Sequence, residues 1–158
     1  MQIYTSLDSY KGPRPIVTMG TFDGMHPGHR ALLEKLKELA RRENTRAMVI
    51  SFWPHPRIVL EHDAEKLRLL TTLEEKTRMI QDTGVDDLMI VPFSKELADL
   101  TAEEFVDEIL VKKLNILHLL IGYNHRFGKG GTSFEQLIPI SHTFGFEISQ
   151  FKHIDVTG

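Results

Sequence analysis

Five short apolar segments recur along the chain, and amphipathic helical patterns separate them. Apolar segments of about four to eight residues bounded by turn residues are typical of buried strands. The alternation of strand and helix predicts right-handed crossover connections and a mostly parallel sheet covered by helices on both faces. We therefore expect an open, doubly wound α/β fold. The expected strands are residues 15–20, 47–52, 87–93, 118–122 and 146–151.

The first helix is expected over residues 27–42. Pro27 suits the first helical position, because proline has no N–H group to leave unpaired there. Apolar side chains recur at helical spacing and predict one buried face. These residues are Leu32, Leu33, Leu36, Leu39 and Ala40.

Two further helices begin with a threonine that is followed three residues later by a glutamate, the pattern of a capping box. We expect the first to stop near Gly84 and the second to end before Asn115. A last helical segment follows Thr132 and Ser133, and Pro139 predicts a kink or an early stop within it. The capping pairs are Thr72 with Glu75 and Thr101 with Glu104.

Length and charge limit the function classes. The chain has 158 residues, 41% of them hydrophobic and 26% charged, which predicts one packed globular domain over residues 1–158. The formal net charge of −3 provides no overall positive field for a nucleic acid backbone. We therefore expect no nucleic acid partner and only local binding of any phosphate group.

The chain contains no cysteine, which excludes disulfides, thiol nucleophiles and thiolate metal sites. Its first residues lack the character of a signal peptide, and no segment approaches the roughly 18 apolar residues of a membrane span. We expect a cytoplasmic protein without a membrane partner.

Ligands of open α/β sheets bind outside the carboxyl ends of the strands, so the loops after strands are the candidate sites. The first of these is part of VTMGTFDGMHPGHR, residues 17–30. Gly20 allows close backbone approach to a ligand, and a helix N-terminus attracts anions. His26 and His29 lie three residues apart and face the same way, so they can donate to phosphate oxygens. The alternatives are a helix cap with a surface histidine, or a zinc pair, for which no third ligand lies nearby.

The second loop is SFWPHPR, residues 51–57. Pro54 and Pro56 stiffen the backbone around His55 and fix the direction of its imidazole. This arrangement suits a ligand contact. The alternative is a rigid turn with a solvated histidine.

The third loop is GYNHRFGKGGT, residues 122–132. Asn124 can pair with an amide or hydroxyl group, Arg126 can bind phosphate in a bidentate manner, and Phe127 can stack on a planar ring. This mixture suits a nucleotide or a flavin, and the alternative is a flexible basic loop. Because all three loops leave carboxyl ends of strands, together they favour a site for a phosphate-bearing ligand.

GTFDGMHPGH resembles the signature of the HxGH nucleotidyltransferases in the form used by prokaryotic FAD synthetases, the FMN adenylyltransferase module of bifunctional riboflavin kinase/FAD synthetases. The segments SFWPHPR, LTTLEEK, VPFSKELADLTAEEFV and GYNHRFGKGG follow in the family's order, so the resemblance covers nearly the whole chain. It implies a Rossmann-like nucleotidyltransferase fold and transfer of AMP from ATP to FMN, with Mg²⁺, to give FAD and pyrophosphate.

The resemblance also implies roles for individual residues. His26, His29 and Asn124 would be catalytic, and no residue is assigned as a metal ligand. The residues expected to bind ATP are Gly20, Phe22, Asp23, His26, Gly28 and His29. Those expected to bind the flavin are Pro54, His55, Asn124, Arg126 and Phe127.

The chain departs from the family pattern in two places. His125 stands where the family often has an aromatic residue, and the sequence ends at FKHIDVTG, before the family's Ser/Thr-Arg motif and riboflavin kinase domain. We expect residues 1–158 to be the adenylyltransferase module of a longer protein that carries the kinase domain in cis, and the alternative is a shortened natural variant. This chain is then expected to lack riboflavin kinase activity.

Two other functions stay open at this point. One is a non-catalytic nucleotide-binding remnant, which would bind ATP or FMN without turnover. The other is an HxGH transferase with a different acceptor, such as nicotinamide mononucleotide, phosphopantetheine or glycerol 3-phosphate.

Overall fold

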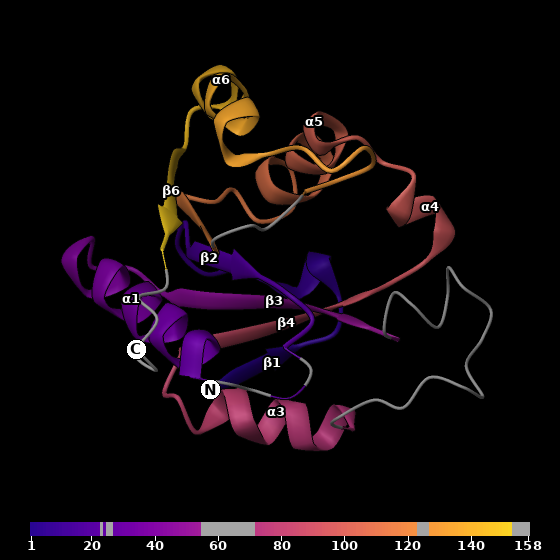
Figure 1. Ribbon diagram of the computed structural model, residues 1–158. Coiled ribbons are helices and arrows are strands. Elements are labelled where there is room, and N and C mark those ends of the chain that lie inside the picture. The colour runs from indigo at the N-terminus through magenta and orange to yellow at the C-terminus, as the bar shows by residue number, and fades with distance from the viewer. Residues whose placement is uncertain (23, 25–26, 55–71, 123–126, 153–158) are drawn as a thin grey trace, which may run out of the picture.

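The computed structural model describes residues 1–22, 24, 27–54, 72–122 and 127–152. Within this part of the chain, six parallel strands form one sheet in the order β1-β4-β3-β2-β5-β6 (Figure 1). The strands are β1 Gln2–Tyr4, β2 Ile16–Met19, β3 Ala47–Trp53, β4 Asp87–Pro92, β5 His118–Gly122 and β6 Glu147–Phe151.

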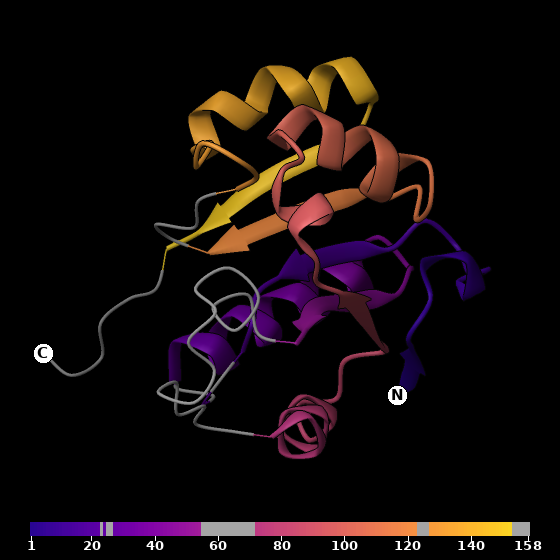
Figure 2. The ribbon, with the colours of Figure 1, turned by 90° about the vertical axis from the view of Figure 1, so that its right-hand side faces the viewer.

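Helices cover both faces of the sheet, as the two perpendicular ribbon views show (Figures 1 and 2). The helices α1 and α3 lie on one face, and α5, α6 and the π-helical segment η2 lie on the other. Their bounds, with those of the short α4 and η1, are α1 Pro27–Arg42, α3 Leu73–Gln81, α4 Lys95–Ala98, α5 Ala102–Phe105, η2 Val106–Val111, α6 Phe134–Phe144 and η1 Leu7–Ser9.

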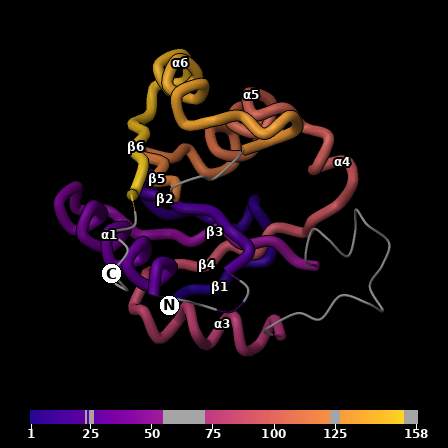
Figure 3. The backbone as a smooth tube through the Cα atoms, in the orientation of Figure 1, coloured from indigo at the N-terminus to yellow at the C-terminus, as the bar shows by residue number. Residues whose placement is uncertain are grey.

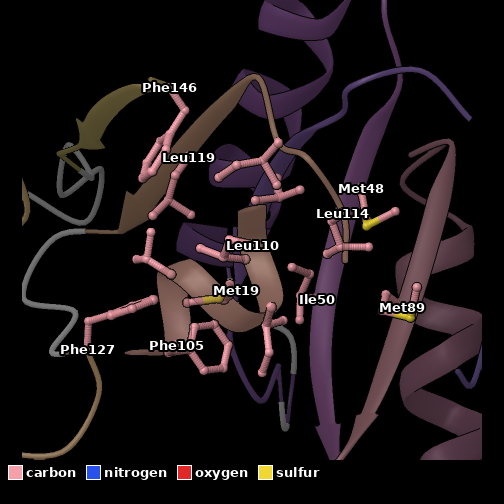
Figure 4. Packing of buried hydrophobic residues seen from close by; sticks show 14 of the residues in the cluster. Met19, Met48, Ile50, Met89, Phe105, Leu110, Leu114, Leu119, Phe127 and Phe146 are labelled. Carbon is pink, nitrogen blue, oxygen red and sulfur yellow. The ribbon is translucent and has the colours of Figure 1, made fainter. Parts of the chain in front are cut away.

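Successive strand residues enter opposite cores, because side chains alternate across a sheet. In β2, Ile16 packs in the core beneath α1 and α3, whereas Val17 and Met19 pack in the core beneath η2 and α6. This second core also contains Phe105 and Leu119 (Figure 4). The central strands are therefore buried on both faces, as a parallel sheet requires.

The strand order reverses beside β2. From β2 the chain runs through β3 to β4 on one side, and then crosses to β5 and β6 on the other side (Figure 3). This switch point between β2 and β5 is where open α/β sheets bind ligands. The first and third candidate loops follow these two neighbouring strands, and the second follows β3.

The expected α/β fold is confirmed, and each expected strand corresponds to an observed one. The capping box at Thr101 is present with both reciprocal hydrogen bonds, and Thr72 accepts a hydrogen bond from the backbone N–H of Glu75. The sequence analysis did not identify β1, because three mostly exposed residues carry no hydrophobic pattern. The expected early stop at Pro139 is wrong. A capping box at Ser133 supports α6, which continues through the exposed Pro139 to Phe144.

The half-buried His118 at the start of β5 makes stability depend on pH. Burial lowers the pKa of its imidazole below the ordinary 6.5, and Glu147 and Glu43 offset this only in part. The unfolded chain then binds a proton at higher pH than the folded chain does, so the free energy of unfolding should fall as the pH drops below 6.5. Urea unfolding above and below this pH checks the effect, which should be smaller in His118→Gln. An equal pH effect in both proteins would contradict it.

Candidate functional site

The structure describes six of the predicted site residues: Gly20, Phe22, Gly28, His29, Pro54 and Phe127. The predicted roles of the other five fall on residues outside the described part of the chain, namely Asp23, His26, His55, Asn124 and Arg126. Of the described six, Gly20, Phe22, Gly28 and His29 belong to the end of β2 and the start of α1, directly beside the switch point.

An aromatic contact joins the end of β2 to the first turn of α1. The ring of Phe22 lies against the imidazole of His29, with 5.2 Å between ring centroids and 58° between ring planes. Phe22 is only 2% exposed and belongs to the core beneath α1. The imidazole of His29 is therefore held on one side by a ring that is itself fixed in the core.

Gly20 leaves the space that Phe22 fills. A Cβ atom built on Gly20 would lie 3.0 Å from Cε2 of the Phe22 ring, closer than almost all real Cβ contacts. The backbone N–H of Gly20 donates to the carbonyl of Ile50, so the residue still belongs to the sheet. Glycine at this position lets the Phe22 ring approach the strand backbone closely.

The helix α1 begins at Pro27, as the sequence predicts, and it runs for 16 residues. Gly28 is buried in its first turn, and His29 is partly exposed. The backbone N–H groups of a first helical turn have no partner within the helix, and the helix dipole adds partial positive charge there. His29 therefore stands where an anion is favoured.

A second set of polar contacts lies at the end of β3. The Oγ of Ser51 donates a hydrogen bond of 3.2 Å to the carbonyl of Thr21, and the Nζ of Lys76 donates one of 3.4 Å to that same Oγ. Lys76, in α3, is 2% exposed, and its Nζ lies 5.8 Å from the ring centroid of Trp53. This network connects α3 and β3 to the loop that follows β2.

The two predicted flavin residues that the structure describes are Pro54 and Phe127. Pro54 directly follows β3 and is joined to Trp53 by a cis peptide bond. Phe127 is 2% exposed and packs edge-on against Phe105, with ring centroids 5.2 Å apart, in the core beneath η2 (Figure 4). A flavin contact of either residue stays a prediction.

Two kinds of feature are absent from the described part of the chain. There, no three His, Asp or Glu side chains gather into a group that could hold a metal ion. None of the described helices is both long and apolar enough to cross a membrane.

The sequence analysis missed the roles of Lys76, Ser51 and Thr21. Lys76 belongs to the quoted segment LTTLEEK, but it received no function there. A signal was available, because Lys76 and the fully buried Ile80 lie four residues apart on one face of α3. A lysine on a buried helical face needs a polar partner, and here Ser51 is one.

The close contact at Gly20 gives a testable prediction. In Gly20→Ala the new methyl group should displace the Phe22 ring by a few tenths of an ångström, and with it His29. We expect weaker ATP binding and slower FAD formation, by less than the roughly 100-fold loss that a misplacement of about 1 Å can cause. Calorimetry and product analysis measure both. In the control Gly122→Ala, at the end of β5, the methyl would lie 3.9 Å from Leu32. ATP binding and FAD formation should be nearly unchanged in this variant. Equal losses in the two variants would contradict the prediction.

Comparison with known proteins identifies relatives of the chain. The family model for FAD synthetase matches residues 10–158. The bifunctional riboflavin kinase/FMN adenylyltransferase of Escherichia coli (strain K12) is 40% identical over 135 residues, which are 85% of this chain and 43% of that protein. The protein of the same name from Bacillus subtilis (strain 168) is 32% identical over 126 residues, 80% of this chain and 40% of that protein. The chain thus spans less than half the length of these relatives.

Solved structures share the fold. A macrolide-efflux protein from Streptococcus pneumoniae aligns over 99% of this chain and 52% of that one, with a TM-score of 0.84 and 26% identity. Pantothenate synthetase from Thermus thermophilus aligns over 98% of this chain and 62% of that one, with a TM-score of 0.60 and 18% identity, a likeness that shows the fold alone. With a family model that matches nearly its whole length and relatives that are 32% and 40% identical, the chain belongs to the FAD synthetase family.

Proposed function

We propose that the protein transfers AMP from ATP to the phosphate of FMN and so forms FAD and pyrophosphate. The observation that carries the proposal is His29, which the core residue Phe22 holds in the first turn of α1 at the switch point of the sheet. Because the chain belongs to the FAD synthetase family, we propose that this position binds the phosphates of a nucleotide.

The reaction exchanges one phosphoanhydride bond for another. A phosphate oxygen of FMN attacks the α-phosphorus of ATP, the bond from that phosphorus to the β-bridging oxygen breaks, and pyrophosphate leaves with the bonding electron pair. The protein forms no covalent bond in such a step. It aligns the two substrates and stabilises the charge that develops on the phosphates.

His29 and the first turn of α1 are proposed to hold the ATP phosphates. An imidazole N–H and backbone N–H groups can donate to phosphate oxygens there, and the helix dipole favours the same negative charge. We propose that His26, Asp23, Gly20 and Gly28 complete this half of the site. Phe22 already fixes the ring of His29. That side chain therefore loses little further conformational entropy when the reaction takes place.

The acceptor half of the site is proposed to lie along the loops after β3 and β5, which follow strands next to β2 on either side. Pro54, His55 and Arg126 are its proposed flavin contacts, together with Phe127, and Asn124 would act between the two substrates. Two substrates bound over neighbouring strand ends would meet across the switch point.

Mg²⁺ is proposed to arrive on the triphosphate, whose hard oxygen atoms it prefers. There it would neutralise part of the charge on the leaving pyrophosphate. No described residue is assigned to it. We further propose that residues 1–158 correspond to the adenylyltransferase portion of relatives whose names couple this activity to a riboflavin kinase.

The function is tested by incubating the protein with ATP, Mg²⁺ and FMN and separating the flavins by chromatography. FAD should form in proportion to enzyme and time, and riboflavin in place of FMN should give no FAD, because it lacks the acceptor phosphate. ATP and FMN binding without any FAD would overturn the proposal in favour of a non-catalytic nucleotide-binding protein. Adenylyl transfer only to nicotinamide mononucleotide or phosphopantetheine would overturn the choice of acceptor.

A further inference from the structure

The buried Lys76 has no part in the proposed function so far. It reaches the end of β3, where its Nζ lies 3.4 Å from the Oγ of Ser51 and 5.8 Å from the ring centroid of Trp53. Only 2% of this residue is exposed. Burying an ammonium group costs free energy. Its contacts therefore favour the fold only where they fix a neighbouring group in place.

Lys76 and Thr21 meet at the same hydroxyl group. The Oγ of Ser51 donates its single proton to the carbonyl of Thr21, and it accepts a hydrogen bond from Lys76. A positively charged donor polarises the hydroxyl and strengthens the bond that the hydroxyl donates. The hydrogen bond from Ser51 to the carbonyl of Thr21 is therefore coupled to the one that Lys76 donates to Ser51.

The carbonyl of Thr21 belongs to the peptide bond that leads into Phe22. Phe22 has a φ of +51°, in the left-handed region that bulky L-residues rarely adopt. Such a conformation is strained, and surrounding contacts must hold it in place. A hydrogen bond to this carbonyl fixes the peptide plane, and thus the torsion that turns the Phe22 ring toward His29.

We propose that Lys76 is a positioning residue for ATP binding. It acts through Ser51 and the peptide between Thr21 and Phe22 to hold the ring of His29 in the first turn of α1. The inference rests on the proposed function, since it takes His29 to bind the ATP phosphates. Lys76 lies in α3, outside the loop after β2 and the first turn of α1. The proposal therefore adds a residue from another helix to those that shape the ATP-binding half of the site.

Two single variants and their combination test the proposal. Lys76→Met keeps the apolar stem and removes the charged donor, and Ser51→Ala removes the shared hydroxyl with little change of shape. Each should raise both the Kd for ATP in calorimetry and the KM for ATP about three- to tenfold, with the KM for FMN nearly unchanged. The double variant should be no worse than the more affected single variant, because both changes break one chain of contacts.

The matched control is Lys37→Met. Lys37 is a partly buried lysine whose Nζ donates to the carbonyl of Thr83, a residue that follows α3. Its loss removes a hydrogen bond donated by a lysine, and an ion pair with Glu34, without touching the loop after β2. ATP binding should therefore stay at the parent value, even if the free energy of unfolding falls.

The experiments distinguish failure of the proposed role of Lys76 from failure of the proposed FAD-forming reaction. An unchanged Kd for ATP in folded Ser51→Ala, or multiplicative effects in the double variant, would overturn the role of Lys76 while FAD formation by the parent protein stands. If Lys76→Met does not fold, Ser51→Ala alone decides. If the parent binds ATP but forms no FAD, the proposed reaction fails, and the Kd values for ATP still test the positioning role.

Discussion

Replacement of His29 by alanine should lower kcat/KM for FAD formation at least about 100-fold, the usual effect of removing one donor to a charge that develops in a transition state. The imidazole is held at the helix N-terminus by Phe22, and it is the described side chain that we propose donates to the ATP phosphates. ATP binding should weaken more than FMN binding. Steady-state kinetics with each substrate varied, together with calorimetry of each, measures both effects.

The control for this variant is His142→Ala. His142 is an exposed histidine in the last turn of α6, and its loss removes the same side chain from the surface. This variant should keep the kinetic constants of the parent. If His29→Ala weakened FMN binding more than ATP binding, the assignment of the two halves of the site would be reversed.

Of the substitutions proposed, Gly128→Ala should lower the free energy of unfolding most. Gly128 has a φ of +68°, and a Cβ atom on it would lie 2.5 Å from the backbone nitrogen of Ala102 and 2.7 Å from its Cα. The left-handed conformation alone costs about 1–2 kcal/mol. The clash is with backbone at the start of α5, which can move only by disturbing the capping box there, so we expect a total of at least about 3 kcal/mol in urea unfolding.

Gly130 offers a matched control in the same turn. Its φ is +91°, but a Cβ atom there would meet nothing within 4 Å. Gly130→Ala should therefore cost only the conformational part, about 1–2 kcal/mol. Equal losses of unfolding free energy in the two variants would show that the contact with Ala102 contributes nothing.

The sequence predicts the architecture well, because its strands and helices carry strong periodic signals. The segment containing β3 is apolar except for Ser51, and α1 shows one leucine-rich face between a proline and two arginines. These signals are local, and together they imply a parallel sheet. The missed β1 shows the limit of this reasoning, since three residues paired only to β4 owe their conformation to that tertiary contact.

The candidate site is only partly predictable for the same reason. The histidine motif identifies the start of α1, because the residues that start a helix and those that can bind phosphate are adjacent in the sequence. The contact of Phe22 with His29 and the hydrogen bonds from Lys76 to Ser51 and from Ser51 to Thr21 join residues that are not neighbours in the sequence, and the last of these bonds spans 30 positions. Such contacts arise from the packing of α1 and α3 on the sheet, which no local sequence pattern predicts.

The central claim is that ATP donates its α-phosphoryl group, with the adenosine attached, to FMN. It is tested most directly with ATP labelled at either the α- or the γ-phosphate and incubated with the protein, Mg²⁺ and FMN. Label from the α-phosphate should enter FAD, and label from the γ-phosphate should appear only in pyrophosphate. Label from the γ-phosphate in a flavin, or none from the α-phosphate, would contradict the account.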